Sequence, residues 1–256
     1  MLTKEYILEC LEKFCNFNEL TEDNFYEQIV VPLKDNMCFN NWDSAQGVTK
    51  GVLIFNELDY VVKIPFRGEG RLIEEHWEGE CGTWYSYNTR HCDYSKTPAH
   101  WTHIDEEDTF EEFCGAEEPE GWNYCQVEKE IAEKAKNSTI TNCFAKTSFL
   151  GYADGYPIYI QEHCTIYCDE QSSRYEETYR HRTKNDYDSL KEVRERVDFW
   201  HIDDNWLLDF LIYWGEEMLK NLAEFIFKEN IQDLHCGNIG YRKGVPVLVD
   251  YSSFNG

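Results

Sequence analysis

The sequence predicts an α+β protein in which antiparallel strands and amphipathic helices are combined in one chain of 256 residues. At two places, 149–160 and 239–249, short apolar runs flank a glycine-containing turn, a pattern typical of a β-hairpin. Between them, apolar residues from 206 to 228 keep helical spacing, which is typical of a buried helix. The hydrophobic content of 42% and the aromatic content of 16% are ample for a packed core.

The charge and the cysteines limit the partners and the compartment of the chain. A net charge of −25 argues against direct binding of nucleic acid, because such binding needs Lys and Arg to neutralise phosphates. The same charge repels anionic membranes, and no apolar run approaches the roughly 18 residues of a membrane span. Eleven scattered cysteines favour free thiols in a reducing, cytoplasmic location. The acidic residues are spread out, so solubility explains them better than a basic partner or mimicry of a nucleic acid does.

Residues 1–36 are predicted to form an N-terminal helical segment that serves packing. Apolar residues at helical spacing run from Tyr6 to Phe14. Thr21 is a candidate cap for a second helix, and Pro32 limits the regularity of that helix. We therefore expect two helices here and no chemistry.

Residues 37–66 are predicted to begin a sheet. A glycine-containing loop over 44–51 precedes two strands, 52–55 and 60–64. Lys63 interrupts the apolar run of the second strand. If Lys63 is buried, it requires an anionic partner, whereas ordinary strand alternation would leave it facing solvent.

An acidic insertion rich in Trp and Cys follows at about 67–122. Its tryptophans favour a folded segment over a disordered one. Several Cys and His residues make a zinc site conceivable. No CxxC or HxxxH spacing supports it, so ordinary loop or core residues are the preferred interpretation. The candidate zinc ligands are Cys81, His91, Cys92, His100, His103, Cys114 and Cys125.

A helix is predicted over 123–136. Its inner stripe is predicted to contain Val127, Ile131 and Ala135. Glu130 borders this stripe, whereas Glu128 is less well placed. Alternatively, Glu130 forms an i,i+4 surface pair with Lys134. The hairpin that follows leads into Gln161-Glu162-His163-Cys164, and a charged connector is predicted over 168–205.

The last hairpin is predicted to place two polar side chains together. A two-residue turn at Lys243-Gly244 sets a register in which Asn238 faces Val249. Asn238 and Asp250 then lie side by side at the open end, and Asp233 lies on the preceding loop. A carboxylate and an amide oxygen at one point suit Mg²⁺, and a second carboxylate nearby suits a hydroxyl nucleophile. Asp, Gly and Asn are also turn residues, so an ordinary turn is the alternative.

The order of these features resembles the protein-kinase-like superfamily, which includes aminoglycoside phosphotransferases and choline kinases. Asp233-Leu234-His235-Cys236-Gly237-Asn238 resembles the catalytic loop of its small-molecule branch. Val249-Asp250-Tyr251-Ser252 resembles the metal-binding Asp-Phe-Gly element, and Tyr60-Val61-Val62-Lys63 resembles the strand with the phosphate-binding lysine. The resemblance covers roughly residues 40–66 and 123–252.

The resemblance implies a role for each candidate site residue. Lys63 would hold the α- and β-phosphates of ATP and be oriented by Glu130, and Asp233 would accept the proton of the nucleophile. Asn238 and Asp250 would hold Mg²⁺. Backbone N–H groups of the glycine-containing loop would cover the phosphates, and the end of the first hairpin would meet the adenine. The further cofactor-binding residues are Gly47, Thr49, Lys50, Gly51, Glu162 and Cys164.

The resemblance also implies a two-lobed protein-kinase-like fold. Residues 37–164 would form an N-lobe with an antiparallel sheet, one helix and the insertion at about 67–122. Residues 165–256 would form a reduced, mainly helical C-lobe with the catalytic loop and the metal-binding hairpin. The loop over 44–51 lacks the G-x-G-x-x-G pattern, and few residues follow Asp250, so the chain departs from the family at both places.

The predicted function is that of an ATP- and Mg²⁺-dependent phosphotransferase acting on an unknown small-molecule or protein hydroxyl. One alternative is a catalytically inactive, nucleotide-binding, pseudokinase-like interaction protein, which the reduced C-lobe and the insertion favour. Another is an acidic inhibitor or nucleic-acid mimic, such as a phage counter-defence protein, which rests on charge alone. The sequence does not identify the acceptor, because one fold hosts many functions.

Overall fold

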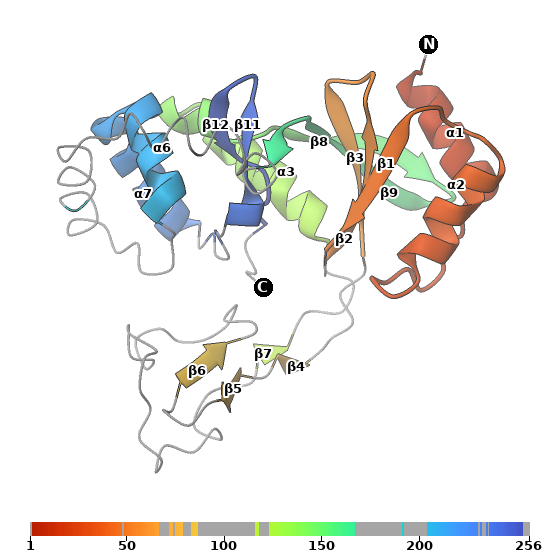
Figure 1. Ribbon diagram of the computed structural model, residues 1–256, viewed down its shortest axis with the longest axis horizontal. Coiled ribbons are helices and arrows are strands. Elements are labelled where there is room, and N and C mark those ends of the chain that lie inside the picture. Colours follow the sequence, from red (N-terminus) through yellow and green to blue (C-terminus); the bar gives the residue numbers. More distant parts are fainter. Residues whose placement is uncertain are drawn as a thin grey trace. The chain divides into compact units, whose positions relative to one another are not determined.

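The computed structural model has the α+β composition that the sequence predicts (Figure 1). It describes residues 2–47, 49–66, 123–166, 191, 204–229, 231, 234 and 236–252, and the backbone of four short strands within 67–122. These strands are β4 (Leu72–Ile73), β5 (Glu75–Glu78), β6 (Thr83–Ser86) and β7 (Ala116–Glu117). Contacts divide the chain into one unit of Met1–Phe66 with Asn123–Ser253 and a second of Arg67–Trp122 with Phe254–Gly256. Of the candidate zinc ligands, only Cys125 belongs to the described residues.

A five-stranded antiparallel sheet lies in the first unit. The strands predicted at 52–55 and 60–64 and the hairpin predicted over 149–160 are confirmed. The predicted loop over 44–51 is wrong in extent, because the first two strands pair from Gln46 and Gly51 outward. Between these strands, the Gly47 N–H donates to the Lys50 carbonyl oxygen (3.0 Å). The sheet order is β1 (Trp42–Gln46), β2 (Lys50–Phe55), β3 (Tyr60–Pro65), β9 (Tyr156–Glu162) and β8 (Thr147–Ala153).

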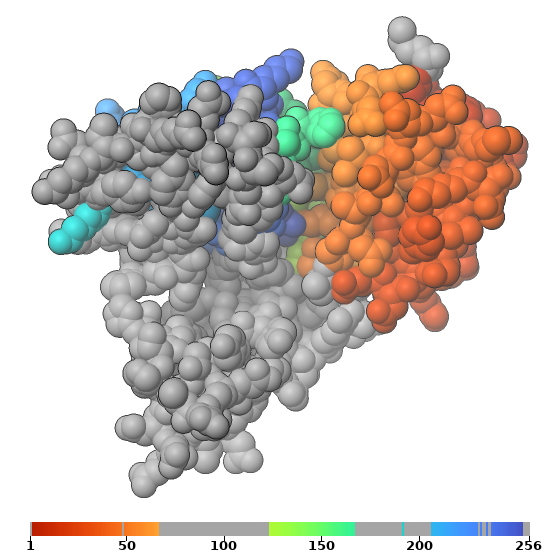
Figure 2. Space-filling view, in the orientation of Figure 1, coloured from red at the N-terminus to blue at the C-terminus, as the bar shows by residue number. Residues whose placement is uncertain are grey.

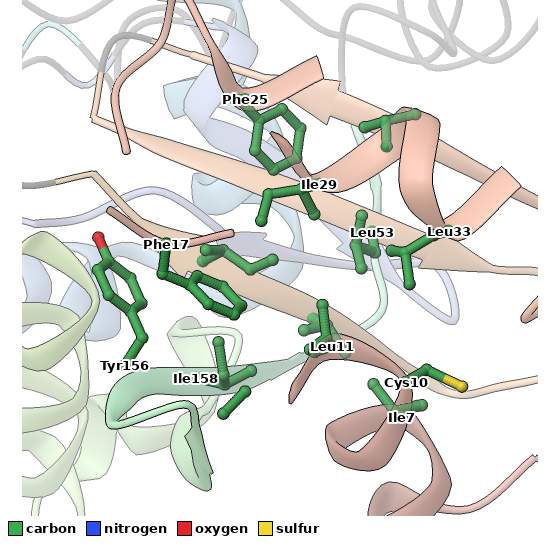
Figure 3. Close-up of a cluster of buried hydrophobic side chains, with 14 of the residues drawn as sticks. Ile7, Cys10, Leu11, Phe17, Phe25, Ile29, Leu33, Leu53, Tyr156 and Ile158 are labelled. Carbon is green, nitrogen blue, oxygen red and sulfur yellow. The ribbon is translucent and has the colours of Figure 1, made fainter. Parts of the chain in front are cut away.

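Helices α1 (Lys4–Phe14) and α2 (Val31–Asp35) cover one face of this sheet (Figure 1). Alternation along the strands sends one set of apolar side chains to these helices, and together they form a buried cluster (Figure 3). Figure 2 shows the N-terminal helices and β1–β3, coloured red to orange, gathered on the same side of the view. The cluster includes Ile7, Leu11, Ile29 and Leu33 from the helices and Leu53, Val62, Ile64 and Ile158 from the strands.

Pro32 makes the second helical stretch irregular, as predicted. A π-helix, Tyr26–Val30, leads directly into α2. Proline has no N–H to bond the carbonyl oxygen four residues earlier. That carbonyl group, of Gln28, instead accepts a hydrogen bond from the Asn16 N–H (3.2 Å). The helical stretch is thereby joined to the segment that precedes it.

Gly51 allows the ring of Phe25 to pack directly on the sheet. A Cβ atom at Gly51 would lie 2.1–2.6 Å from three ring carbons of Phe25, which is closer than van der Waals contact permits. Gly51→Ala is therefore expected to lower the free energy of unfolding by about 1–3 kcal/mol. Gly47→Ala is the control, because a Cβ atom there meets nothing within 4 Å. Urea unfolding of both variants checks this prediction, and equal losses of stability would contradict it.

Helix α3 (Tyr124–Ala135) packs on β3 and β8 and connects the sheet to a second, helical core. In that core, its apolar residues meet α6 (Asp204–Trp214) and α7 (Glu216–Lys228). The prediction of one continuous helix over 206–228 is wrong, because Gly215 separates α6 from α7 with a φ of 82°. A positive φ cannot continue a right-handed helix, and glycine adopts it without steric cost. Most of the connector predicted over 168–205 lies outside the described residues.

The last hairpin is confirmed with the register expected from a two-residue turn. Strand β11 (Ile239–Arg242) pairs antiparallel with β12 (Val245–Leu248). Lys243 and Gly244 form the turn with φ values of 52° and 85°, which are the left-handed values of a type I′ turn. Strand β10 (Thr165–Ile166) pairs with β11 and completes a three-stranded sheet. Within the described part of the chain, no helix has both the length and the apolar character needed to cross a membrane.

Candidate functional site

Lys63 is buried on β3 and is only 4% exposed. Its neighbours Val62 and Ile64 belong to the core under α1 and α2, so strand alternation sends Lys63 to the opposite face of the sheet. There its ammonium nitrogen lies 3.0 Å from Oε1 and 2.9 Å from Oε2 of Glu128. It also donates to the carbonyl oxygen of Val249 (3.0 Å). The anionic partner that a buried lysine requires is therefore present.

The carboxylate that holds Lys63 is Glu128, so the prediction that Glu130 orients this lysine is wrong. Glu130 is exposed, and its carboxylate accepts a hydrogen bond from the Gln126 side chain (2.7 Å). Glu128 lies instead on the buried side of α3 and is fully buried. Helical spacing of apolar residues placed the inner stripe at Val127, Ile131 and Ala135, so the charged Glu128 was not assigned to the buried side. The buried residues of α3 are Tyr124, Cys125, Glu128, Ile131 and Ala135.

Lys50 adds a second buried ammonium group. It is the first residue of β2, and it is 4% exposed. Its Nζ lies 2.7 Å from Oε1 of Glu128 and 2.7 Å from Oδ1 of Asp250. Burial lowers the pKa of Lys50, but the carboxylates of Asp250 and Glu128 outweigh it, so the pKa lies above its ordinary value. Lys50 is thus a charged strand residue that the structure pairs with two acids, which the loop prediction did not foresee.

Asp250 joins the last hairpin to this cluster. The carbonyl oxygen of Asn238 accepts hydrogen bonds from the N–H groups of Val249 (2.9 Å) and Asp250 (3.3 Å). This confirms that Asn238 and Asp250 lie side by side at the open end of the hairpin. Burial raises the pKa of Asp250, but the ammonium groups of Lys50 and Lys63 outweigh it and hold that pKa below its ordinary value. Asp250 is therefore a carboxylate at neutral pH.

Neutral side chains from β8, β9 and the end of the last hairpin complete the surroundings of Glu128. Thr147 donates from Oγ1 to Oε2 of Glu128 (3.0 Å). Gln161 donates from Nε2 to Oγ1 of Thr147 (2.8 Å) and to the carbonyl oxygen of Val249 (2.8 Å). The Tyr251 hydroxyl lies 3.3 Å from that of Thr147. Sequence reasoning missed these roles, although a polar Gln161 at the end of an apolar strand is a signal that points to a buried partner.

The charges of this ion-pair cluster (Lys50, Lys63, Glu128 and Asp250) balance, because two ammonium groups face two carboxylates. The bonded partners are 65, 78 and 200 residues apart in the chain, so β2, β3, α3 and the end of the last hairpin must meet to build it. A buried ion pair carries a large desolvation cost and is weak evidence for stability. Titratable groups with shifted pKa values gather at functional sites, so we regard the cluster as the candidate functional site.

The loop residues assigned to phosphate binding have local structural contacts. The Gly47 N–H donates to the Lys50 carbonyl oxygen, and Gly51 packs against Phe25. The carbonyl oxygen of Thr49 accepts the Phe66 N–H (2.9 Å). These contacts involve the backbone of Gly47 and Thr49 and the close packing at Gly51. The contribution of these residues to phosphate binding stays a prediction.

Of the residues assigned to the adenine and to the catalytic base, the structure describes Glu162 and Cys164. The Glu162 carboxylate accepts from Arg242 (2.6 Å), and its N–H donates to the Lys146 carbonyl oxygen (3.2 Å). The Cys164 thiol donates to the Glu162 carbonyl oxygen (3.5 Å), and burial raises the pKa of that thiol to about 12. Asp233 lies outside the described residues, so its role as the base stays a prediction.

Cys125, which is fully buried on α3, is expected to make the stability of the protein sensitive to alkaline pH. Burial raises its thiol pKa from 9.0 to about 12, and the Glu128 carboxylate acts in the same direction. Above pH 9 the unfolded chain releases this proton while the native protein keeps it. The free energy of unfolding should therefore fall by up to ~1.4 kcal/mol per pH unit from this thiol alone.

The test compares wild type with Cys125→Ala by urea unfolding at several pH values from 8 to about 11, with a reductant present. We expect a shallower loss of stability with rising pH in the variant, whatever its stability at pH 8. Parallel losses in the two proteins would show that Cys125 does not contribute.

Comparisons with protein-family models, curated proteins and solved structures find no match for this chain. Among the residues that the structure describes, no three or more His, Cys, Asp and Glu side chains are grouped to hold a metal ion. The function must therefore be argued from the chemistry of the ion-pair cluster and of the hairpin beside it.

Proposed function

We propose that this chain has a two-lobed protein-kinase-like fold and is an ATP- and Mg²⁺-dependent phosphotransferase that acts on the hydroxyl group of a small molecule or protein. The observation that carries the proposal is the ion-pair cluster. It joins a strand lysine, Lys63, to a helix carboxylate, Glu128, beside a hairpin that ends in Asp250. A strand lysine paired with a helix glutamate, beside a metal-binding aspartate, is part of the machinery with which kinases hold the phosphates.

The donor atoms at the end of the hairpin suit Mg²⁺. The Asp250 side chain, which ends in a carboxylate, is 33% exposed. Asn238 lies beside it through a backbone hydrogen bond and carries a side-chain amide oxygen. Magnesium prefers such oxygen ligands and keeps several waters when few protein ligands are available. Bound there, the metal would neutralise phosphate charge, and Asn238 and Asp250 would hold it.

The remaining residues would bind and orient the nucleotide. The Lys63 ammonium would bind phosphate oxygens, and Glu128 would keep the Lys63 side chain in one orientation. Thr147 would fix the Glu128 carboxylate through its hydrogen bond, and Gln161 would hold the Thr147 hydroxyl. Asp233 would orient the acceptor hydroxyl and take its proton. Positioning and charge neutralisation of this kind are the main contributions that a protein makes to phosphoryl transfer.

A nucleotide-binding protein without catalysis is the second candidate, and one observation favours it. The carboxylate assigned to the metal is already paired with an ammonium group, since Lys50 lies 2.7 Å from Asp250. A protein that needs no metal could retain this pair while phosphates bind to Lys63. ATP binding that is independent of Mg²⁺, without turnover, would support this candidate over the first.

The proposal is tested by measuring transfer or hydrolysis of the γ-phosphate of labelled ATP with Mg²⁺. Asp250→Asn and Asp233→Ala are each expected to reduce the rate by about 100-fold or more, because one weakens the metal site and the other removes the base. Asp154→Asn is the matched control, since it makes the same change in the turn between β8 and β9. Turnover that survives both site changes unaltered would reject the phosphotransferase.

A further inference from the structure

Lys50 occupies a position that the proposed function does not explain. Its Nζ lies 2.7 Å from Oδ1 of Asp250, the carboxylate assigned to the metal, and 3.4 Å from the Ser252 hydroxyl. The same Nζ also lies 2.7 Å from Oε1 of Glu128. An ammonium group is thus held between the carboxylate that orients Lys63 and the carboxylate of the hairpin.

We propose that Lys50 is an internal counter-cation of Asp250, which a divalent metal ion displaces, and that the displaced ammonium group then serves as a second phosphate-binding cation. This inference rests on the proposed function and assigns a part to a residue that the proposed mechanism leaves unused. In addition to the proposed function, it requires that the metal ion and Lys50 compete for the Asp250 carboxylate.

The exposures of the two side chains fit such an exchange. The Asp250 side chain is 33% exposed, whereas that of Lys50 is 5% exposed, so an ion from solvent would approach this pair from the Asp250 side. Lys50 would keep an ionic partner after it leaves Asp250, because its bond to Glu128 is independent of the hairpin. The exchange therefore does not leave a buried ammonium group without a counter-charge, which would be costly.

Charge balance links the exchange to phosphate binding. The four side chains of the cluster sum to zero, with two ammonium groups and two carboxylates. A divalent ion at Asp250 leaves the site with two net positive charges, which an anionic polyphosphate neutralises. Metal and polyphosphate should therefore each raise the affinity of the protein for the other, since such coupling is reciprocal.

The experiment measures Mn²⁺ binding without nucleotide, by calorimetry, in the full chain. Lys50→Met is expected to bind Mn²⁺ about tenfold more tightly than wild type. In this variant the ion no longer has to displace the Lys50 ammonium group from the Asp250 carboxylate. Adding Asp250→Asn to Lys50→Met should abolish that binding. Lys220→Met is the control, because it removes the same charge from a surface pair with Glu216 on α7 and should leave Mn²⁺ affinity unchanged.

Two further outcomes separate this inference from the proposed function. If wild type and Lys50→Met bind Mn²⁺ with equal affinity, and Asp250→Asn abolishes binding in both, Lys50 does not compete with the metal ion. The metal site at Asp250 would still stand. Absence of Asp250-dependent Mn²⁺ binding in every variant, with or without ATP, would overturn the metal site and the competition with it. If Lys50→Met does not fold, Lys50→Gln keeps a hydrogen-bond donor towards Glu128 without the charge, and the same comparison applies.

Discussion

Glu128→Ala is expected to lower the free energy of unfolding by about 3–5 kcal/mol, because it removes one partner of a buried ion pair. Glu128 is fully buried and accepts bonds from Lys50, Lys63 and Thr147. Without it, the ammonium group of Lys63 keeps only a carbonyl oxygen, that of Val249, among the partners described above. The loss arises mainly from the uncompensated charge and only secondarily from the cavity.

Glu130→Ala is the matched control, two residues away on the same helix. Glu130 is exposed and bonded to Gln126, so its loss should change the free energy of unfolding by less than ~0.5 kcal/mol. Urea unfolding, followed by tryptophan fluorescence and circular dichroism, measures both variants under the same conditions. Comparable losses for Glu128→Ala and Glu130→Ala would contradict the placement of the ion-pair cluster. Glu128→Gln, which keeps the side-chain volume, should fall between the two.

Lys63→Met is expected to weaken ATP binding by about 10- to 100-fold while the protein remains folded. Removal of a lysine from this cluster differs from removal of the glutamate. Glu128 would still accept hydrogen bonds from Lys50 and Thr147, so no carboxylate is left without donors. Methionine also matches the length of the lysine side chain and fills the space above α3. The expected loss is therefore one of phosphate recognition rather than of folding.

Calorimetric titration with ATP and Mg²⁺ measures the effect, and the melting temperature verifies that the variant is folded. Lys220→Met again removes one positive charge at a distance from the cluster, and its affinity for ATP should equal that of wild type. Wild-type affinity in Lys63→Met would mean that Lys63 serves structure alone, and the proposed nucleotide site would lose its phosphate-binding residue.

The hairpins could be predicted because their signals are local. Lys243-Gly244 supplies the two left-handed residues that a type I′ turn needs, and this fixed the register that brings Asn238 next to Asp250. Lys63 could be singled out because it interrupts an apolar strand. In each case the informative residues lie within a few positions of one another in the chain.

The partners of these residues could not be predicted in the same way. Glu128 is buried because lysines 65 and 78 residues away neutralise it, and no periodicity within α3 reveals that. Lys50 was assigned to a loop because it lies between Gly47 and Gly51, whereas its ion pair is with Asp250, 200 residues away. Gly215 ends the expected long helix because its φ is positive. The apolar residues on either side keep helical spacing, so the sequence pattern did not predict this break.

The central claim, that the ion-pair cluster and the hairpin form a nucleotide site, is tested most directly by thermal unfolding with and without ATP and Mg²⁺. A ligand that binds only the native state stabilises it by about 2.7 kcal/mol at a concentration 100 times its Kd. The proposed site predicts that ATP with Mg²⁺ raises the Tm of wild type and that Lys63→Met and Asp250→Asn each lose most of this rise. An unchanged Tm at every ATP concentration, or the same rise in all three proteins, would contradict it.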